Sequence, residues 1–160
     1  MQALIKTKNI RKALELGCSV IEKKSTLPVL ANIKLEAIQG DAGQPSSVRL
    51  TSTDMFLSLQ SSVPAEVSAA GPITIPARTL FDIVRKVDDD SEISLTAAES
   101  GNSVKVDLPF SNFSLPTLPA EEFPTLESND NYNMFSVNAG ILLSLLDRTK
   151  HAVSNEEIRY

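Results

Sequence analysis

Residues 48–59 read VRLTSTDMFLSL, and residues 104–115 read VKVDLPFSNFSL, a weaker copy of the same pattern. Both stretches consist of two strand-like runs separated by a break that contains Asp or Pro. Each stretch follows a short strand-like segment and a helix-like segment. Because an internal repeat of this length corresponds to one supersecondary unit, the sequence predicts two successive βαβββ units.

Two such units predict an α+β domain in which two packed sheets carry both helices on one side. The expected strands are residues 2–6, 29–37, 48–52 and 56–63 in the first unit, and 73–76, 92–97, 104–108 and 112–115 in the second. The expected helices are residues 10–22 and 78–87. The first helix has apolar residues at i, i+3, i+4 spacing, Asn9 as its N-cap, and Arg11 and Lys12 on its outward face.

Residues 119–133 have the composition of a linker, being rich in acids, Asn and Pro. We therefore expect a first domain over residues 1–118 and the incomplete start of a second domain over residues 134–160. The latter begins with a strand over 134–137 and a helix over 140–153, which repeats the order of the first domain. Its apolar helix face would be left uncovered, and such faces favour swapping or aggregation.

Composition excludes several classes of protein. No stretch reaches the eighteen apolar residues of a membrane helix, and the N-terminus does not resemble a signal peptide, so we expect a cytoplasmic protein without membrane contact. Cys18 is the single cysteine, which excludes an intramolecular disulfide and a thiolate metal cluster within one chain.

No catalytic site is indicated. His151 is the single histidine and has no placed partner, Cys18 falls on the apolar stripe of the first helix, and Asp88–Asp90 lack the ligand spacing of a calcium loop. Phosphate-binding glycine motifs are absent from the sequence. The sequence therefore predicts a protein that is not an enzyme and has no cofactor and no metal.

Charge is sorted by structural element in this chain, whose formal net charge is −5. The three helix-like windows, residues 8–24, 77–86 and 138–153, carry net charges of +3, +2 and +1. Because helices of tandem units lie on one side of the sheets, these charges would add into one positive face for a polyanion. Few aromatic residues accompany them, so the contacts would be to phosphates and insensitive to base sequence.

Five segments carry a family resemblance: STLPVLANIKLEA at 25–37, LTSTDMFLSL at 50–59, TIPARTLFDIVRKV at 74–87, FSLPTLPAEEFPTL at 113–126 and EEIRY at 156–160. Together they resemble the N-terminal portion of the bacterial sliding clamp, the beta subunit of DNA polymerase III. The resemblance implies the DNA-clamp fold, with two βαβββ repeats per domain, and a homodimeric ring of six such domains that encircles duplex DNA. The ring would confer processivity on the polymerase, with the DNA polymerase catalytic subunit and the clamp loader as partners.

The resemblance also implies residue roles. The cations that would reach DNA are Lys24, Arg78, Arg85, Lys23, Lys12 and Lys86, whereas the acidic Glu156 stands where a relative has a polar contact. The joint between two copies would use Phe113 and Leu115 as apolar contacts. Around them, relatives carry cations where this chain has Thr79, Ser103, Phe110 and Asn112, which are uncharged. We therefore expect a joint that depends little on salt. Arg159 and Tyr160 match the edge of the groove that binds partner peptides.

Two other functions remain open at this stage. The chain could be a protein-interaction module that recruits partners by strand addition at residues 112–115, with the basic helices as solubilising faces. It could also be a hydrolase that uses His151. Salt-sensitive binding to duplex DNA distinguishes the clamp from the module, and replacement of His151 tests the hydrolase.

Overall fold

The computed structural model describes residues 1–21, 27–41, 43–98, 101–124 and 136–153. Its contacts divide the chain into two compact units, Met1–Leu126 and Glu127–Tyr160. The helical elements of the first unit are α1 (Thr7–Val20), η1 (Pro28–Ala31), α2 (Ala77–Val84) and η2 (Ala120–Glu122). Its strands are β1 (Gln2–Lys6), β2 (Asn32–Ile38), β3 (Ser47–Thr53), β4 (Ser58–Pro64), β5 (Glu66–Ala69), β6 (Gly71–Pro76), β7 (Glu92–Ala97), β8 (Ser103–Leu108) and β9 (Ser111–Pro116).

These strands form two antiparallel sheets, one with the order β5-β1-β7-β8-β9 and one with the order β4-β3-β2-β6. The first strand of each predicted βαβββ repeat lies in the sheet of the other repeat, since β1 pairs with β7 and β6 pairs with β2. The series β1-α1-β2-β3-β4 and β6-α2-β7-β8-β9 are therefore equivalent. The predicted repeat and the two-sheet α+β fold are confirmed, and the exchange of strands makes each half depend on the other.

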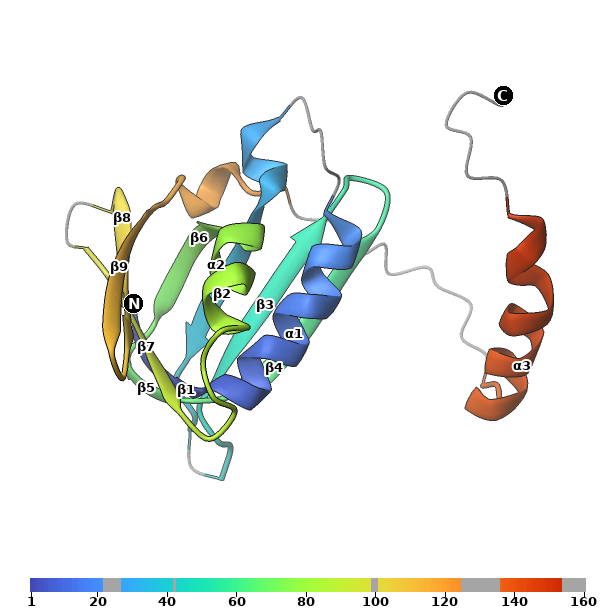
Figure 1. The fold of residues 1–160 in the computed structure, drawn as a ribbon, viewed down its shortest axis with the longest axis horizontal. Helices are drawn as coiled ribbons and strands as arrows, with labels where there is room; N and C mark the ends of the chain where they lie inside the picture. The colour runs from blue at the N-terminus through green and yellow to red at the C-terminus, as the bar shows by residue number, and fades with distance from the viewer. Residues whose placement is uncertain (22–26, 42, 99–100, 125–135, 154–160) are drawn as a thin grey trace. The chain divides into compact units, whose positions relative to one another are not determined.

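Helices α1 and α2 cover the same face of the first unit and lie side by side (Figure 1). One core joins them to both sheets. It includes Ile10 and Leu14 of α1, Leu80 and Val84 of α2, and strand residues such as Leu35, all of which are fully buried. Since complete burial of a Leu or Ile side chain contributes about 1.5–3 kcal/mol, the helices are fixed to the sheets mainly by this apolar contact.

The predicted start of the first helix and its cap at Asn9 are wrong. The helix α1 begins at Thr7, and its cap position, Lys6, makes no side-chain hydrogen bond. Instead, the N–H groups of Thr7 and Lys8 donate to the carbonyl oxygens of Ser91 and Asp89. The other half of the domain thus satisfies the start of this helix, which no local cap signal could indicate.

Two predicted strands begin later than expected, and one strand was missed. Residues 28–31 form η1, with Pro28 in its first turn, so the strand that follows starts at Asn32. Residues 54–57 form the turn between β3 and β4, and the next strand therefore starts at Ser58. The short strand β5, over Glu66–Ala69, pairs with β1 at the edge of the larger sheet.

Residues 119–123 pack with the first unit, although their composition is that of a linker. Phe123, which is 3% exposed, contacts Val29 and Leu30 in a small second core, with Leu118 beside them. The hydroxyl of Thr74 donates to the carbonyl oxygen of Leu118 at 2.7 Å. The segment after β9 is therefore held against β6 and η1 as far as Phe123.

The described part of the second unit contains the helix α3 (Ala139–Thr149) and the turn η3 (Lys150–Ala152). Asn138 caps α3, because its side-chain oxygen accepts hydrogen bonds from the N–H groups of Gly140 and Ile141. Ile141, Leu142, Leu145 and other apolar side chains of α3 are between 43% and 62% exposed. Within the described residues, none of the helices has the length and apolar character needed to span a membrane.

Candidate nucleic-acid interface

Helices α1 and α2 run antiparallel, so the end of each lies beside the start of the other. The Nη2 atom of Arg78, in the first turn of α2, donates a 3.0 Å hydrogen bond to the carbonyl oxygen of Ile21, which follows α1. Arg78 itself remains exposed. It is thus fixed at the end of α1, immediately before residues 22–26, and it keeps a charge that a phosphate can approach.

The predicted cations Lys23 and Lys24 lie outside the described residues. Of the other four, Lys12 is exposed on α1, and Arg78, Arg85 and Lys86 are exposed at or after α2. These four therefore lie on, or directly after, two helices that pack side by side (Figure 1). Lys8, one turn before Lys12, is exposed beside it and adds a cation that the resemblance did not assign.

Neighbouring acids reduce the charge of this face. Arg85 forms an exposed ion pair with Asp82, with 3.1 Å between the Nη2 and Oδ1 atoms. Both side chains are more than half exposed, so the pair is weak and either group can exchange its partner for solvent or a phosphate.

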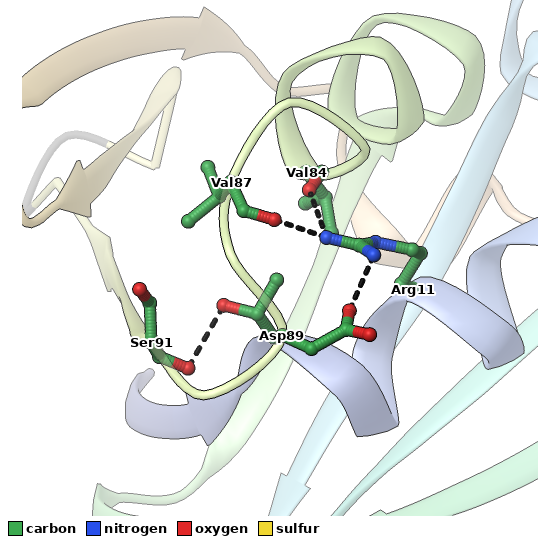
Figure 2. Close-up of polar contacts among 6 residues, drawn as sticks. Arg11, Val84, Val87, Asp89 and Ser91 are labelled. Atoms are coloured by element: carbon green, nitrogen blue, oxygen red, sulfur yellow. Dashed lines mark hydrogen bonds and ion pairs between the residues drawn. The ribbon is translucent and has the colours of Figure 1, made fainter.

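The predicted outward position of Arg11 is wrong. Its side chain is 28% exposed, and its guanidinium group binds the carbonyl oxygens of Val84 and Val87 and the carboxylate of Asp89 (Figure 2). A cation at the end of a helix is stabilised because the last carbonyl groups carry partial negative charge. Arg11 therefore holds the end of α2, and it contributes no free charge to the helix face.

Cys18 lies in the contact between the two helices. Burial raises the pKa of its thiol, the positive charge of Arg78 lowers that pKa, and the negative charge of Asp82 raises it. A raised pKa keeps the thiol protonated and unreactive at neutral pH. The predicted packing role of Cys18 agrees with this environment.

Neither α1 nor α2 presents an aromatic side chain on which a base could stack. Phe81 is the aromatic residue of α1 and α2, and it packs against the core. The exposed groups are ammonium and guanidinium ions, which bind phosphate oxygens by charge and hydrogen bonds. Asp89, within the acidic run 88–90, is occupied by Arg11. The geometry thus suits contact with a nucleic-acid backbone and offers no base readout.

A second candidate surface lies where the resemblance placed a joint between copies. Strand β9 is an edge strand, paired with β8 on one side. Thr79, Phe110 and Phe113 line one hollow beside it, and Ser103 and Asn112 line a smaller one with Phe113. The sixth predicted joint residue, Leu115, differs: it is 7% exposed and belongs to the core, opposite Val104.

This surface carries charged side chains, although its predicted joint residues are uncharged. Asp82, Lys86 and Asp88 stand at the larger hollow together with Thr79. The sequence also gave no reason to connect Ile83 and Val87, at the end of α2, with Leu108, before the β8–β9 turn. The folded domain brings them to the border of one hollow. The groove residues Arg159 and Tyr160 lie outside the described residues, as does Glu156.

Known proteins resemble this chain over its whole length. A family model described as the DNA polymerase III beta subunit, N-terminal domain, matches residues 1–127. The beta sliding clamp of Caulobacter vibrioides is 34% identical over 160 residues, covering all of this chain and 41% of the relative. That of Pseudomonas aeruginosa is 36% identical over 161 residues, covering all of this chain and 42% of the relative.

Solved structures show the same similarity. The Caulobacter crescentus pol III beta structure has a TM-score of 0.87 at 34% identity, and that of the DNA polymerase III subunit beta from Pseudomonas aeruginosa has a TM-score of 0.83 at 35% identity. Each alignment covers all of this chain and 41% of the solved one. The chain thus spans about two fifths of the length of these relatives.

Proposed function

Because this chain belongs to the DNA polymerase III beta subunit family, we propose that it acts as part of a sliding clamp. The clamp is a non-catalytic accessory subunit that encircles duplex DNA and holds the replicative DNA polymerase on its template. It binds DNA without regard to base sequence. Its place of action is the cytoplasm, where a bacterial chromosome is copied.

One observation carries the DNA-binding part of this proposal. The equivalent helices α1 and α2 lie together on one face, and Lys8, Lys12, Arg78 and Lys86 are exposed on or just after them. The predicted cations Arg85, Lys23 and Lys24 complete the set. A ring built from such domains would turn this face toward the DNA, so that each domain adds a few cations to the lining.

Weak contact is an advantage for such a protein. The logarithm of the DNA-binding constant falls with the logarithm of the salt concentration, with a slope of about −0.9 for each phosphate contact on duplex DNA. A few contacts per domain therefore give weak and salt-sensitive binding. Arg11 and Asp82 reduce the number of free charges further. Closure of the ring, rather than affinity, would then keep the protein on DNA and still permit sliding.

The remaining assignments follow from the family. We assign residues 1–118 to the first clamp domain, 119–133 to the segment between domains and 134–160 to the start of a second domain of the same kind. The first five residues of the middle segment, 119–123, pack against the first domain. The DNA polymerase catalytic subunit and the clamp loader are the proposed protein partners, through a groove to which Arg159 and Tyr160 contribute. Two copies form the ring, with the joint at β9. The alternative of a protein-interaction module is not favoured, because the relatives that match the whole chain are named sliding clamps.

Binding of the full-length protein to two duplexes of unrelated sequence tests the DNA contact, with fluorescence anisotropy measured over a series of salt concentrations. We expect equal affinity for both duplexes. Arg78→Ala should reduce the salt slope by about 0.9, the value for one phosphate contact. Arg49→Ala is the matched control, because Arg49 is an exposed arginine of β3 that pairs with Glu36 on β2, away from the helices.

Retention on a nicked circular plasmid tests the ring. After the clamp loader has placed it on the plasmid, the protein should stay on the closed circle through gel filtration and be released when the plasmid is linearised, because a ring slides off free ends. Equal retention on circular and linear plasmids would contradict the proposal, as would an Arg49→Ala effect equal to that of Arg78→Ala.

A further inference from the structure

The segment that follows β9 is attached to β6 by a buried hydroxyl group. We name this segment the exit segment and define it as residues 117–123. The hydroxyl belongs to Thr74, which is fully buried; it donates to the carbonyl oxygen of Leu118 at 2.7 Å and accepts from the N–H group of Leu118 at 3.0 Å. The side-chain amide of Asn32 donates a third hydrogen bond to this hydroxyl at 3.2 Å. Thr74 thus connects β2, β6 and the exit segment.

An apolar contact holds the other end of the exit segment. Phe123 is buried in a small core with Val29 and Leu30 of η1, and Leu118 lies against them. Because removal of apolar surface from water drives such packing, Phe123 fixes η1 to the exit segment. The exit segment, drawn in orange, and η1, drawn in light blue, lie together at the end of the domain where α2 begins (Figure 1). The exit segment is therefore attached to both η1 and β6.

These two attachments lie on the two pieces of chain that the Arg78–Ile21 hydrogen bond joins. Strand β6 ends at Pro76 and continues directly into α2, so Arg78 follows shortly after Thr74. Ile21, whose carbonyl oxygen accepts the hydrogen bond from Arg78, stands at the end of α1 and precedes η1 in the chain. The exit segment thus supports the chain on both sides of this contact.

Three of the five segments that carry the family resemblance supply the residues of this junction, namely Asn32, Thr74 and Phe123. All three side chains are buried, with exposed fractions of 5%, 0% and 3%. They therefore cannot touch DNA or a partner protein themselves. Any part that they play in binding has to act through the exposed residues whose position they fix.

We infer that Thr74 and Phe123 are positioning residues for the cation Arg78. By holding the exit segment, they keep η1 and the start of α2 in the arrangement in which Arg78 reaches the end of α1. The exit segment also leads toward the second unit of the chain, so its displacement moves a residue that contacts DNA. The effect on DNA rests on the proposed clamp function, whereas the positioning of Arg78 does not.

The thiol of Cys18 reports on the position of Arg78 in the absence of DNA. Burial raises the pKa of this thiol, and the positive charge of Arg78 lowers it. Displacement of Arg78 should therefore raise the pKa of Cys18. A general loosening of the helices should lower that pKa, because the thiol would become exposed to water. The sign of the change thus separates a loss of positioning from a loss of structure.

The test compares Thr74→Val and Phe123→Ala with Arg78→Ala in the full-length protein. Thr74→Val keeps the shape of the side chain and removes the hydroxyl, whereas Thr74→Ser keeps the hydroxyl; Phe123→Leu keeps most of the apolar contact. Val63→Ala is the matched control, because Val63 is equally buried but lies beside the start of α1. Melting temperatures show which variants are folded, and Thr74→Val decides the question if Phe123→Ala does not fold.

Two quantities are measured for each folded variant. The pH dependence of alkylation of the peptide that contains Cys18, followed by mass spectrometry, gives the pKa of the thiol. Fluorescence anisotropy with duplex DNA gives the salt slope of binding. We expect Thr74→Val and Phe123→Ala to raise the thiol pKa, and to reduce the salt slope, by at least half of the change seen in Arg78→Ala. Thr74→Ser and Phe123→Leu should restore both quantities toward the wild type.

The possible results separate the inference from the function. A thiol pKa that falls or stays unchanged in Thr74→Val and Phe123→Ala overturns the positioning, and so does an equal rise in Val63→Ala. A thiol pKa that Arg78→Ala leaves unchanged overturns it as well, as does a salt slope that only Arg78→Ala reduces. If Arg78→Ala itself leaves the salt slope unchanged, the DNA contact in the proposed function is overturned, and the thiol pKa still decides the positioning.

Discussion

The Nη2 atom of Arg78 donates a 3.0 Å hydrogen bond to the carbonyl oxygen of Ile21, which ties the start of α2 to the end of α1. Arg11 makes the converse connection, because its guanidinium group binds the carbonyl oxygens of Val84 and Val87 at the end of α2 (Figure 2). Each helix thus receives a cation from the other at its negative end. The same class of residue that would contact DNA also orients the two helices that present it.

Replacement of Arg11 by alanine should lower the free energy of unfolding and have little effect on the affinity for DNA. The variant loses an ion pair with Asp89 and two hydrogen bonds at the end of α2, so we expect the free energy of unfolding to fall by about 1–2 kcal/mol. Urea denaturation measures this change. Lys12→Ala, which removes the neighbouring exposed cation, is the control and should change stability by less than about 0.5 kcal/mol. Equal stability of the two variants would contradict the role given to Arg11.

Gly17 allows α1 to approach β2 closely. A Cβ atom at this position would lie 2.8 Å from the Cδ1 atom of Ile33, a residue that is 1% exposed. Gly17→Ala should therefore lower the free energy of unfolding by about 1 kcal/mol, because overpacking costs about 1–3 kcal/mol and the gain in helix propensity returns up to about 1.

A double-mutant cycle with Ile33→Val tests this explanation. Valine lacks the Cδ1 atom, so the double variant should be more stable than the sum of the two single changes predicts. Additive effects in urea denaturation would show that the close contact is not the cause.

The carboxylate of Asp54 organises the β3–β4 turn. It accepts hydrogen bonds from the N–H groups of Leu57 and Phe56, at 2.6 and 2.9 Å, and these bonds lower the pKa of Asp54. A carboxyl whose pKa is lower in the folded than in the unfolded state stabilises the fold above its unfolded pKa, which is about 3.9. That contribution disappears as the pH falls through the lower, folded pKa.

We therefore expect Asp54→Asn to be less stable than the wild type at neutral pH and the difference to shrink below about pH 4. Urea denaturation at a series of pH values measures it. Asp41→Asn removes an exposed acid from a loop elsewhere in the same unit and is the control. A difference that persists unchanged to pH 2 would refute the electrostatic explanation.

The thiol of Cys18 reports on the charges between the helices. Because burial and Asp82 raise its pKa while Arg78 lowers it, Arg78→Ala should raise the pKa further and Asp82→Asn should lower it. The pH dependence of alkylation by iodoacetamide measures both shifts, with the urea-unfolded protein as the reference for an ordinary thiol. Shifts of the same sign in both variants would contradict the placement of Cys18 between these charges.

Much of the fold could be predicted from local patterns. The periodicity of residues 10–22 and 78–87 indicated two amphipathic helices, and the similarity of 48–59 to 104–115 indicated two equivalent units; both are confirmed. The boundaries failed where distant groups intervene. α1 begins at Thr7 because Ser91 and Asp89 accept its first N–H groups, and those residues are more than eighty positions away in the chain.

The candidate site could likewise be predicted only in part. Sequence located the cations Lys12 and Arg78 on helices. It also placed Lys86 within the second helix, which ends at Val84 instead, and it treated Arg11 as equivalent to these cations. Exposure could not be read from helical spacing alone, since the partner of Arg11 is the end of another helix. The resemblance assigned Leu115 to the joint, and the structure shows that this residue packs into the core of its own domain.

The sequence by itself determined the composition of the helices and strands, the repeat and the family, because these depend on periodicity and on residue identity along the chain. Tertiary structure alone decided three features: which strand of each half joins the sheet of the other half, which arginine binds the carbonyl groups at a helix end, and that Phe110 borders an apolar hollow. These features depend on contacts between segments far apart in the chain. Such contacts form, and contribute to stability, only when the two sheets and the two helices have packed together.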